Sequence, residues 1–311
     1  MAAYAIRRLG LSAIVVVGVS IAVFMMLRLV PGDPVSVMLS QGSTAQDAAA
    51  LKHELGLDRS VFAQYERYAG NALTGDLGTS IRLHEPVARL IGQRLPATLE
   101  LTVASLALAT ALGVLFGTLS AVRHGRLTDH LVRVGSLAGV SLPSFWLGLM
   151  LILLFGVELG VLPIAGRDGL ASLVLPAVTL AMVPLGIITR MVRSSVLDAL
   201  REDYIRTARA KGLGAARTLF GHALRNSLIP LVTVVGVQFG TLLGGAIIVE
   251  TVFAWPGVGS LLIDAVSARD FPLVQGIILM IALGFVLVNL AVDLLYAVLD
   301  PRIRDSMETA S

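Results

Sequence analysis

The feature that most limits the fold of this chain is a set of six apolar runs that contain no Asp, Glu, Lys or Arg. Each run is 19 to 24 residues long. The hydrocarbon core of a bilayer is about 30 Å thick, and a helix needs about 20 apolar residues to cross it. The sequence therefore predicts an all-α membrane protein with six transmembrane helices. The runs are Leu9–Leu27, Leu101–Val122, Val134–Val157, Gly169–Thr189, Asn226–Val249 and Phe271–Val292.

The composition and the lack of reactive motifs exclude a soluble enzyme. Only 14% of the residues are Asp, Glu, Lys or Arg, whereas soluble domains average about 25%. There is no cysteine, and all five histidines lie outside the runs, so we expect no catalytic residue and no metal site. Lys52 and Lys211 do not follow glycine, which excludes a G-x-x-x-x-G-K-[ST] phosphate loop. We therefore expect no cofactor in this chain and no nucleic-acid partner.

The charges between the runs predict the orientation of the chain. Lys and Arg are enriched in short loops on the cytoplasmic side of membranes. Residues 123–133 contain three arginines and one aspartate, and residues 190–225 contain eight basic and three acidic groups. Residues 250–270 hold one arginine and three acidic groups. We therefore expect a multi-pass protein of the cell membrane with both termini in the cytoplasm and membrane lipid as a partner.

The runs and the segments between them divide the chain into three parts. Residues 1–30 form the N-terminal end and the first membrane helix, and residues 31–96 form an extracytoplasmic segment. Residues 97–311 form the core, with five further membrane helices and a cytoplasmic loop at 198–227. Within the extracytoplasmic segment, apolar residues at helical spacing predict a helix from about 45 to 73, with turn residues on both sides.

Three polar residues in or beside the last two runs are candidates for a substrate path: Gln238, Glu250 and Asn289. Polar groups are costly in hydrocarbon unless they bind water or a partner, so they could line a passage. A hydrogen bond between helices explains each of them equally well. Glu100, Glu158 and Glu250 also place acidic groups on the outer side, where they could attract a substrate with a free amino group.

Glycine and proline patterns predict close packing and helix breaks. Gly236, Gly240 and Gly244 recur every four residues and share one helix face, which permits close contact with another helix. That helix belongs either to this chain or to a second, similar subunit. Proline interrupts helices, so kinks are expected in the third and fourth spans. The prolines concerned are Pro143, Pro176 and Pro184.

The second cytoplasmic loop is predicted to contain two helices with a glycine break between them. Residues 203–211 include good helix formers, Gly212, Leu213 and Gly214 interrupt the helix, and residues 215–225 can form the second helix. Such a unit would protrude from the membrane and fit a groove on another protein. Contact of this basic loop with anionic lipid is the alternative.

Several segments resemble the permeases of binding-protein-dependent ABC importers. The loop signature of that family is E-A-A-x3-G-x9-I-x-L-P, and Ala208, Gly212 and Leu224 match it with the spacing intact. The initial Glu and the final Pro are absent, and the segments YIRTARAKGLG and HALRN are similar to the dipeptide/oligopeptide branch, where these departures are usual. The other similar segments are VPGDP (30–34), GDLGTS (75–80), LPSFWLG (142–148), ETVFAWPGVGSLL (250–262) and DPRIR (300–304).

The resemblance implies a type I ABC importer permease fold, and the position of GDLGTS resembles the first permease of a pair. It implies four partner subunits: a second homologous permease, two ATPase subunits that hold ATP and Mg²⁺, and an extracytoplasmic substrate-binding protein. It also implies that the 203–225 loop couples this chain to the ATPase subunits. The coupling residues are then Asp203, Tyr204, Arg206, Ala208, Ala210, Lys211, Gly212, Leu213, Gly214, His222 and Arg225.

The leading hypothesis is therefore the permease subunit of an importer for short peptides or peptide-like solutes. Within the same family, the alternatives are the permease of an importer for glutathione or for a nickel complex. Outside it, the alternatives are an ATP-independent secondary transporter, which would usually carry ionisable residues at mid-membrane, and a membrane scaffold or receptor.

Overall fold

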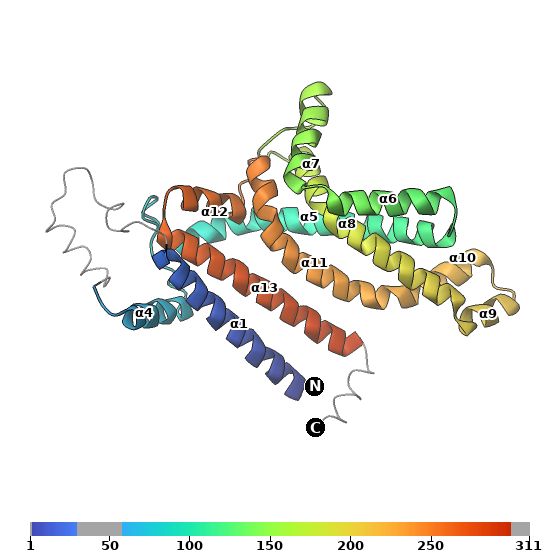
Figure 1. Cartoon of the computed structure of the whole chain (residues 1–311), viewed down its shortest axis with the longest axis horizontal. Helices are drawn as coiled ribbons and strands as arrows, with labels where there is room; N and C mark the ends of the chain where they lie inside the picture. Colours follow the sequence, from blue (N-terminus) through green and yellow to red (C-terminus); the bar gives the residue numbers. More distant parts are fainter. Residues whose placement is uncertain (1, 30–57, 300–311) are drawn as a thin grey trace.

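The computed structural model describes residues 2–29 and 58–299 (Figure 1). These residues form helices, turns and loops, with one isolated bridge between Thr79 and Pro86 and no β-strand. The all-α fold class is therefore confirmed. The helices are α1 (Ala2–Leu29), α4 (Val61–Leu73), α5 (Val87–Val122), α6 (Leu127–Ser141), α7 (Ser144–Leu151), α8 (Leu170–Arg201), α9 (Asp203–Ala210), α10 (Ala215–Thr218), α11 (Leu224–Val252), α12 (Val258–Ser267) and α13 (Phe271–Leu299), with π-helical segments at Ile152–Glu158 and Leu219–Ala223.

Five of the helices in the described ranges are long and apolar enough to cross a membrane unbroken: α1, α5, α8, α11 and α13. The residues of the third expected span instead form two helices, α6 and α7 with its π-helical continuation, which meet at an angle of 105°. Pro143 lies at this break and has an extended backbone, with ψ of 131°. The break expected at Pro143 is therefore confirmed, because proline cannot continue the helix that precedes it.

The two prolines of α8 do not interrupt that helix. Pro176 and Pro184 both lie inside it, and the helix continues from Leu170 to Arg201. The interruption expected in the fourth span is therefore wrong, and a kink within α8 stays a prediction. Both prolines are buried, and neighbouring helices can hold a membrane helix together where a backbone hydrogen bond is missing.

Helix α5 begins well before its apolar run. It starts at Val87 rather than near Leu101, and it continues through Pro96 to Val122. Residues 87–96, at the end of the segment assigned to the extracytoplasmic side, are thus its first turns. Their buried side chains pack against α12 and α13. The apolar run marks the part of the helix that lipid can surround, whereas these first turns are held by protein contacts.

Part of the segment that is predicted to be extracytoplasmic is described. The helix expected at about 45 to 73 is confirmed for Val61–Leu73, and its portion from 45 to 57 lies outside the described residues. The turn at GDLGTS is confirmed, since Gly75 and Gly78 have φ angles of +83° and +82°. The motifs at 30–34 and 300–304 also lie outside the described residues.

Glycines bring α5 and α8 into close contact at the centre of the fold. Gly113 and Gly117 lie one turn apart on α5 and face Ile188 and Val192 of α8, and a β-carbon at either glycine would collide with these side chains. This spacing of small residues allows two helix backbones to approach closely, as in other membrane proteins.

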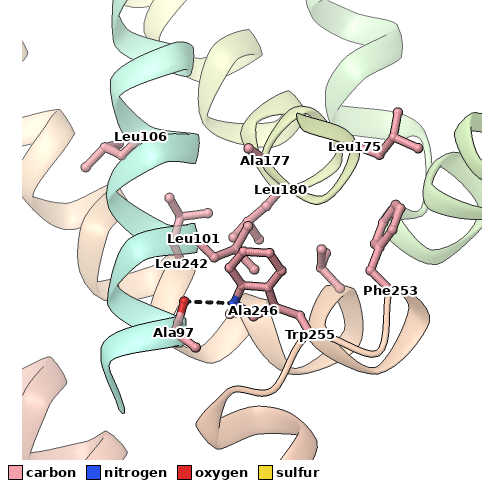
Figure 2. Packing of buried hydrophobic residues seen from close by; sticks show 11 residues of the cluster. Ala97, Leu101, Leu106, Leu175, Ala177, Leu180, Leu242, Ala246, Phe253 and Trp255 are labelled. Carbon is pink, nitrogen blue, oxygen red and sulfur yellow. Dashed lines mark hydrogen bonds between the residues drawn. The ribbon is translucent and has the colours of Figure 1, made fainter. Parts of the chain in front are cut away.

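A second packed region surrounds Trp255, in the turn after α11. The indole is fully buried, and its Nε1 donates a hydrogen bond of 2.8 Å to the carbonyl oxygen of Ala97 on α5 (Figure 2). This turn therefore ties α11 to the first half of α5. The surrounding cluster includes Leu101, Leu106, Leu175, Leu180, Leu242, Ala246 and Phe253.

The helices place the loops at two opposite ends of the molecule. Helices α1, α13 and α11 run side by side, with α9 and α10 at one end and α4 and α12 at the other (Figure 1). Arg8 of α1 and Asp293 of α13 form an ion pair of 2.7 Å, which joins the first and the last described helices.

Candidate functional site

The 203–225 loop, called the knob below, folds as the sequence predicts. Helix α9 covers Asp203–Ala210, and α10 begins at Ala215 after the glycine break. A π-helical segment, Leu219–Ala223, then leads into α11. The knob thus connects α8 directly to α11, and only Glu202 separates α8 from α9.

The glycine break is a Schellman motif, a common way of ending a helix. Gly212 has a φ of +83°, in the left-handed region that glycine adopts at little cost. Its N–H donates to the carbonyl of Arg209 at 3.0 Å, and the N–H of Leu213 donates to the carbonyl of Ala208 at 3.2 Å. A β-carbon at Gly212 would meet no atom within 4 Å, so the demand for glycine comes from the backbone conformation alone.

Four small or aliphatic residues anchor the knob to the helices behind it. Ile205, Ala208, Thr218 and Ala223 are buried. Ile205 and Ala223 pack with Ala199, near the end of α8. These contacts hold the knob in a fixed position and leave the rest of its surface uncovered.

Most of the predicted coupling residues lie on that uncovered surface. Asp203 and Arg206 form an ion pair of 3.2 Å whose side chains are 92% and 80% exposed. Ala208 is an anchor rather than a surface residue, and Leu213 is half-buried. The exposed remainder consists of Tyr204, Ala210, Lys211, Gly212, Gly214, His222 and Arg225.

The three α11 glycines do not share one set of neighbours. A β-carbon at Gly236 would collide with Val292 of α13, and one at Gly240 would come within 3.0 Å of Phe285 of the same helix. A β-carbon at Gly244 would meet no atom within 4 Å. Two of the three glycines thus pack within this chain, and contact with a second subunit remains a prediction.

The three candidate path residues have different surroundings. Gln238 is buried on α11, and Asn289 donates a hydrogen bond to the carbonyl of Phe285 in its own helix at 3.0 Å. Glu250 is fully buried, and its carboxylate accepts hydrogen bonds from the Thr98 hydroxyl at 2.6 Å and from the Ser260 N–H at 3.0 Å. Glu250 therefore joins α5, α11 and α12, and substrate contact by these residues remains a prediction.

The other two glutamates that are predicted to lie on the outer side differ from Glu250. Glu100 accepts a hydrogen bond of 2.8 Å from Nε of Arg167, whose guanidinium lies 5.9 Å from the centre of the Trp255 ring. Glu158 is exposed at the end of the π-helical segment. The three carboxylates thus have three different environments.

An ion pair between α6 and α8, with a buried aspartate and a half-buried arginine, was not predicted. Asp129 of α6 accepts hydrogen bonds from Nε of Arg193 at 2.7 Å and from its Nη2 at 2.9 Å. The Ser120 hydroxyl and the Gly125 N–H also donate to this carboxylate, at 2.6 and 3.0 Å. The pair fixes the turn between α5 and α6 to the helix that ends in the knob. The only signal in the sequence was one acidic residue in a loop of arginines, which does not identify its partner.

Comparison with known proteins agrees with this architecture. Residues 113–305 match the family of binding-protein-dependent transport system inner membrane components, and residues 1–102 match the N-terminal family of the same membrane components. A di/tripeptide transport system permease protein of Pseudomonas aeruginosa is 46% identical, over 98% of this chain and 99% of its own length. A glutathione transport system permease protein of Escherichia coli is 43% identical, over 97% of this chain and 98% of its own length.

A solved structure shares the fold. The inward-facing MetNI methionine ABC transporter contains a chain that aligns with a TM-score of 0.55 and 21% identity, covering 68% of this chain and 96% of that one. The helical arrangement, the match to the family over most of the length and the two permease relatives lead to one assignment. The chain belongs to the family of inner membrane components of binding-protein-dependent transport systems.

Proposed function

We propose that this chain is the permease subunit of an ATP-driven importer of short peptides or peptide-like solutes. The observation that carries the proposal is the 46% identity with a di/tripeptide permease over almost the whole of both chains. The relative that is named for glutathione is 43% identical, and glutathione is itself a small peptide. The cargo chemistry common to both relatives is therefore a short peptide, and glutathione is the second candidate.

The knob is the proposed docking surface for an ATPase subunit. Its exposed residues form a surface that a groove can receive, and its anchors hold this surface against the end of α8. Because only Glu202 separates α9 from α8, a displacement of the knob must move α8 as well. The close contact of Gly113 and Gly117 with α8 then passes that movement to α5.

The other partners follow from this arrangement. A second homologous permease shares the translocation path, two ATPase subunits hold ATP and Mg²⁺, and an extracytoplasmic binding protein delivers the substrate. In this proposal the knob and both termini are cytoplasmic. The basic residues of the 190–225 and 123–133 segments support that orientation.

The coupling role of the knob is tested by two glycine substitutions. Gly212→Val forces a β-branched residue to a φ of +83°, which costs about 1–2 kcal/mol locally and adds a side chain at the docking surface. Gly214→Val is the matched control, because Gly214 has an ordinary φ of −63° and equally open space around it. In proteoliposomes of the whole transporter, Gly212→Val is expected to lower substrate-stimulated ATP hydrolysis and uptake sharply at normal membrane abundance.

Normal transport by Gly212→Val would contradict the coupling role. An equal loss in Gly214→Val would show that the side chain added at the docking surface, and not the backbone strain at position 212, lowers coupling. If contact with lipid were the function of the loop, joint removal of the Arg206 and Lys211 charges would lower transport and Gly212→Val would be nearly silent.

The cargo is tested by competition. Cells that depend on this transporter are given a labelled dipeptide together with an excess of unlabelled tripeptide, glutathione or a nickel chelate. We expect the tripeptide to reduce uptake of the label most strongly. Competition by the nickel chelate alone would refute the peptide assignment and leave the coupling role intact.

A further inference from the structure

Helix α4 lies against the side of α1. The hydroxyl groups of Tyr65 and Ser20 are 2.8 Å apart and form a hydrogen bond. The Phe24 ring packs edge-on against Tyr65 and stacks on Tyr68, with ring centres 5.2 and 5.7 Å apart. All of these α4 side chains come from one face of the helix, so α4 has a defined site on α1.

The position of Ser20 and Phe24 along α1 sets the depth of that site. The apolar part of α1 begins at Arg8, which is paired with Asp293 and marks one boundary of the hydrocarbon core. At 1.5 Å per residue, Ser20 lies about 18 Å and Phe24 about 24 Å from that boundary. The core is about 30 Å thick, so both residues lie about 6–12 Å inside the opposite boundary. Tilting α1 would place them deeper.

The remaining surface of α4 has two unlike flanks. Phe62 and Leu73 are 76% and 89% exposed, and at 3.6 residues per turn they lie about 20° apart around the helix. Arg67 and Asn71, also exposed, lie about 140° and 180° from Phe62. The exposed Glu66 lies about 40° from Phe62, where the apolar flank ends and the polar side begins. An apolar and a polar flank on either side of the face that contacts α1 are what a helix needs to lie in a membrane interface.

We propose that α4 is an interfacial helix and that lipid covers its apolar flank. Phe62 and Leu73 contact the acyl chains around this end of α1, and Arg67 and Asn71 face the headgroups and water. Lipid is the occupant because the contacts with α1 place α4 below the boundary of the hydrocarbon core, where an uncovered apolar flank meets acyl chains. This binding surface is separate from the knob and does not depend on which solute is transported.

The absence of cysteine from the sequence makes a direct test possible. Single cysteines replace Phe62, Leu73, Arg67 or Asn71 in the full chain, assembled with its partner subunits and reconstituted in phosphatidylcholine vesicles. Each cysteine receives a nitroxide label, and collision rates with oxygen and with a water-soluble nickel complex are measured. Ile14→Cys, on the exposed surface of α1, is the lipid reference. Arg82→Cys, in the exposed turn just before α5, is the water reference.

We expect labels at positions 62 and 73 to resemble the lipid reference, with an oxygen-to-nickel collision ratio several-fold above that at positions 67 and 71. Equal nickel accessibility at all four positions would place α4 in water and overturn the proposal. Low collision rates with both reagents at positions 62 and 73 would also overturn it, because protein would then cover the flank. Failure of the cargo or coupling tests would not alter these measurements.

Discussion

The segments on the two sides of α11 differ in what their side chains contact. The knob, before α11, keeps only small or aliphatic anchors inside and exposes its charged residues. The turn after α11 buries Phe253 and Trp255 completely, and Glu250 beside it is enclosed by hydrogen bonds. The turn after α11, called the outer turn below for its predicted side of the membrane, is therefore part of the core of this chain, whereas most of the surface of the knob is exposed. Substitutions in the outer turn should change stability, and substitutions in the knob should change transport.

The largest expected effect is that of Trp255→Ala. It removes a fully buried indole and its hydrogen bond to Ala97, and truncation of a large buried side chain costs about 3–5 kcal/mol. The measurement is thermal unfolding in lipid nanodiscs, followed by circular dichroism. Trp146→Ala is the control, because that indole is 44% exposed. Equal losses in both variants would show that the outer turn is no more critical than the surface of α7.

Glu250→Ala tests whether the outer turn is structural or lines the path. It leaves the Thr98 hydroxyl and the Ser260 N–H without their acceptor, and each buried donor left unpaired costs about 1–3 kcal/mol. We expect a lower unfolding midpoint and lower membrane abundance, but an unchanged apparent substrate affinity per folded molecule. Glu158→Ala should leave all three unchanged. A loss of affinity at normal stability would instead support a path role for Glu250.

The smallest expected effects are those of Arg206→Ala and Asp203→Ala on the knob. Exposed ion pairs contribute about 0.2–1 kcal/mol, and this pair is almost fully in solvent. Unfolding midpoints should therefore stay within error, and ATP-driven uptake should fall by less than in Gly212→Val. A stability loss as large as that of Trp255→Ala would remove the contrast between the two segments.

The sequence predicts the elements whose signal is local. Six apolar runs, the break at Pro143 and the helix, glycine and helix order of the knob depend on residues close together in the chain. The same holds for Gly212, because a Schellman motif joins residues no more than five positions apart.

What the sequence did not predict depends on residues far apart in the chain. The Thr98 to Glu250 bond spans 152 positions, so no local pattern reveals that this carboxylate is enclosed. The same applies to Arg193 on α8, because its ion-pair partner Asp129 lies 64 positions earlier in the chain. Helix α8 continues through two prolines because neighbours support it, and that support is also invisible in a local window. The four-residue spacing of Gly113 and Gly117 was a usable signal for close packing.

The ion pair between Arg8 and Asp293 brings the first and the last described helices of the chain together. Helix α1 packs against α13 rather than against α5, the next long helix along the chain. Its place beside α13 could therefore also be filled by a helix that is connected to the other end of the chain. A circular permutant that joins the two ends of the chain and opens the exposed loop at 159–169 preserves every helix neighbour described above.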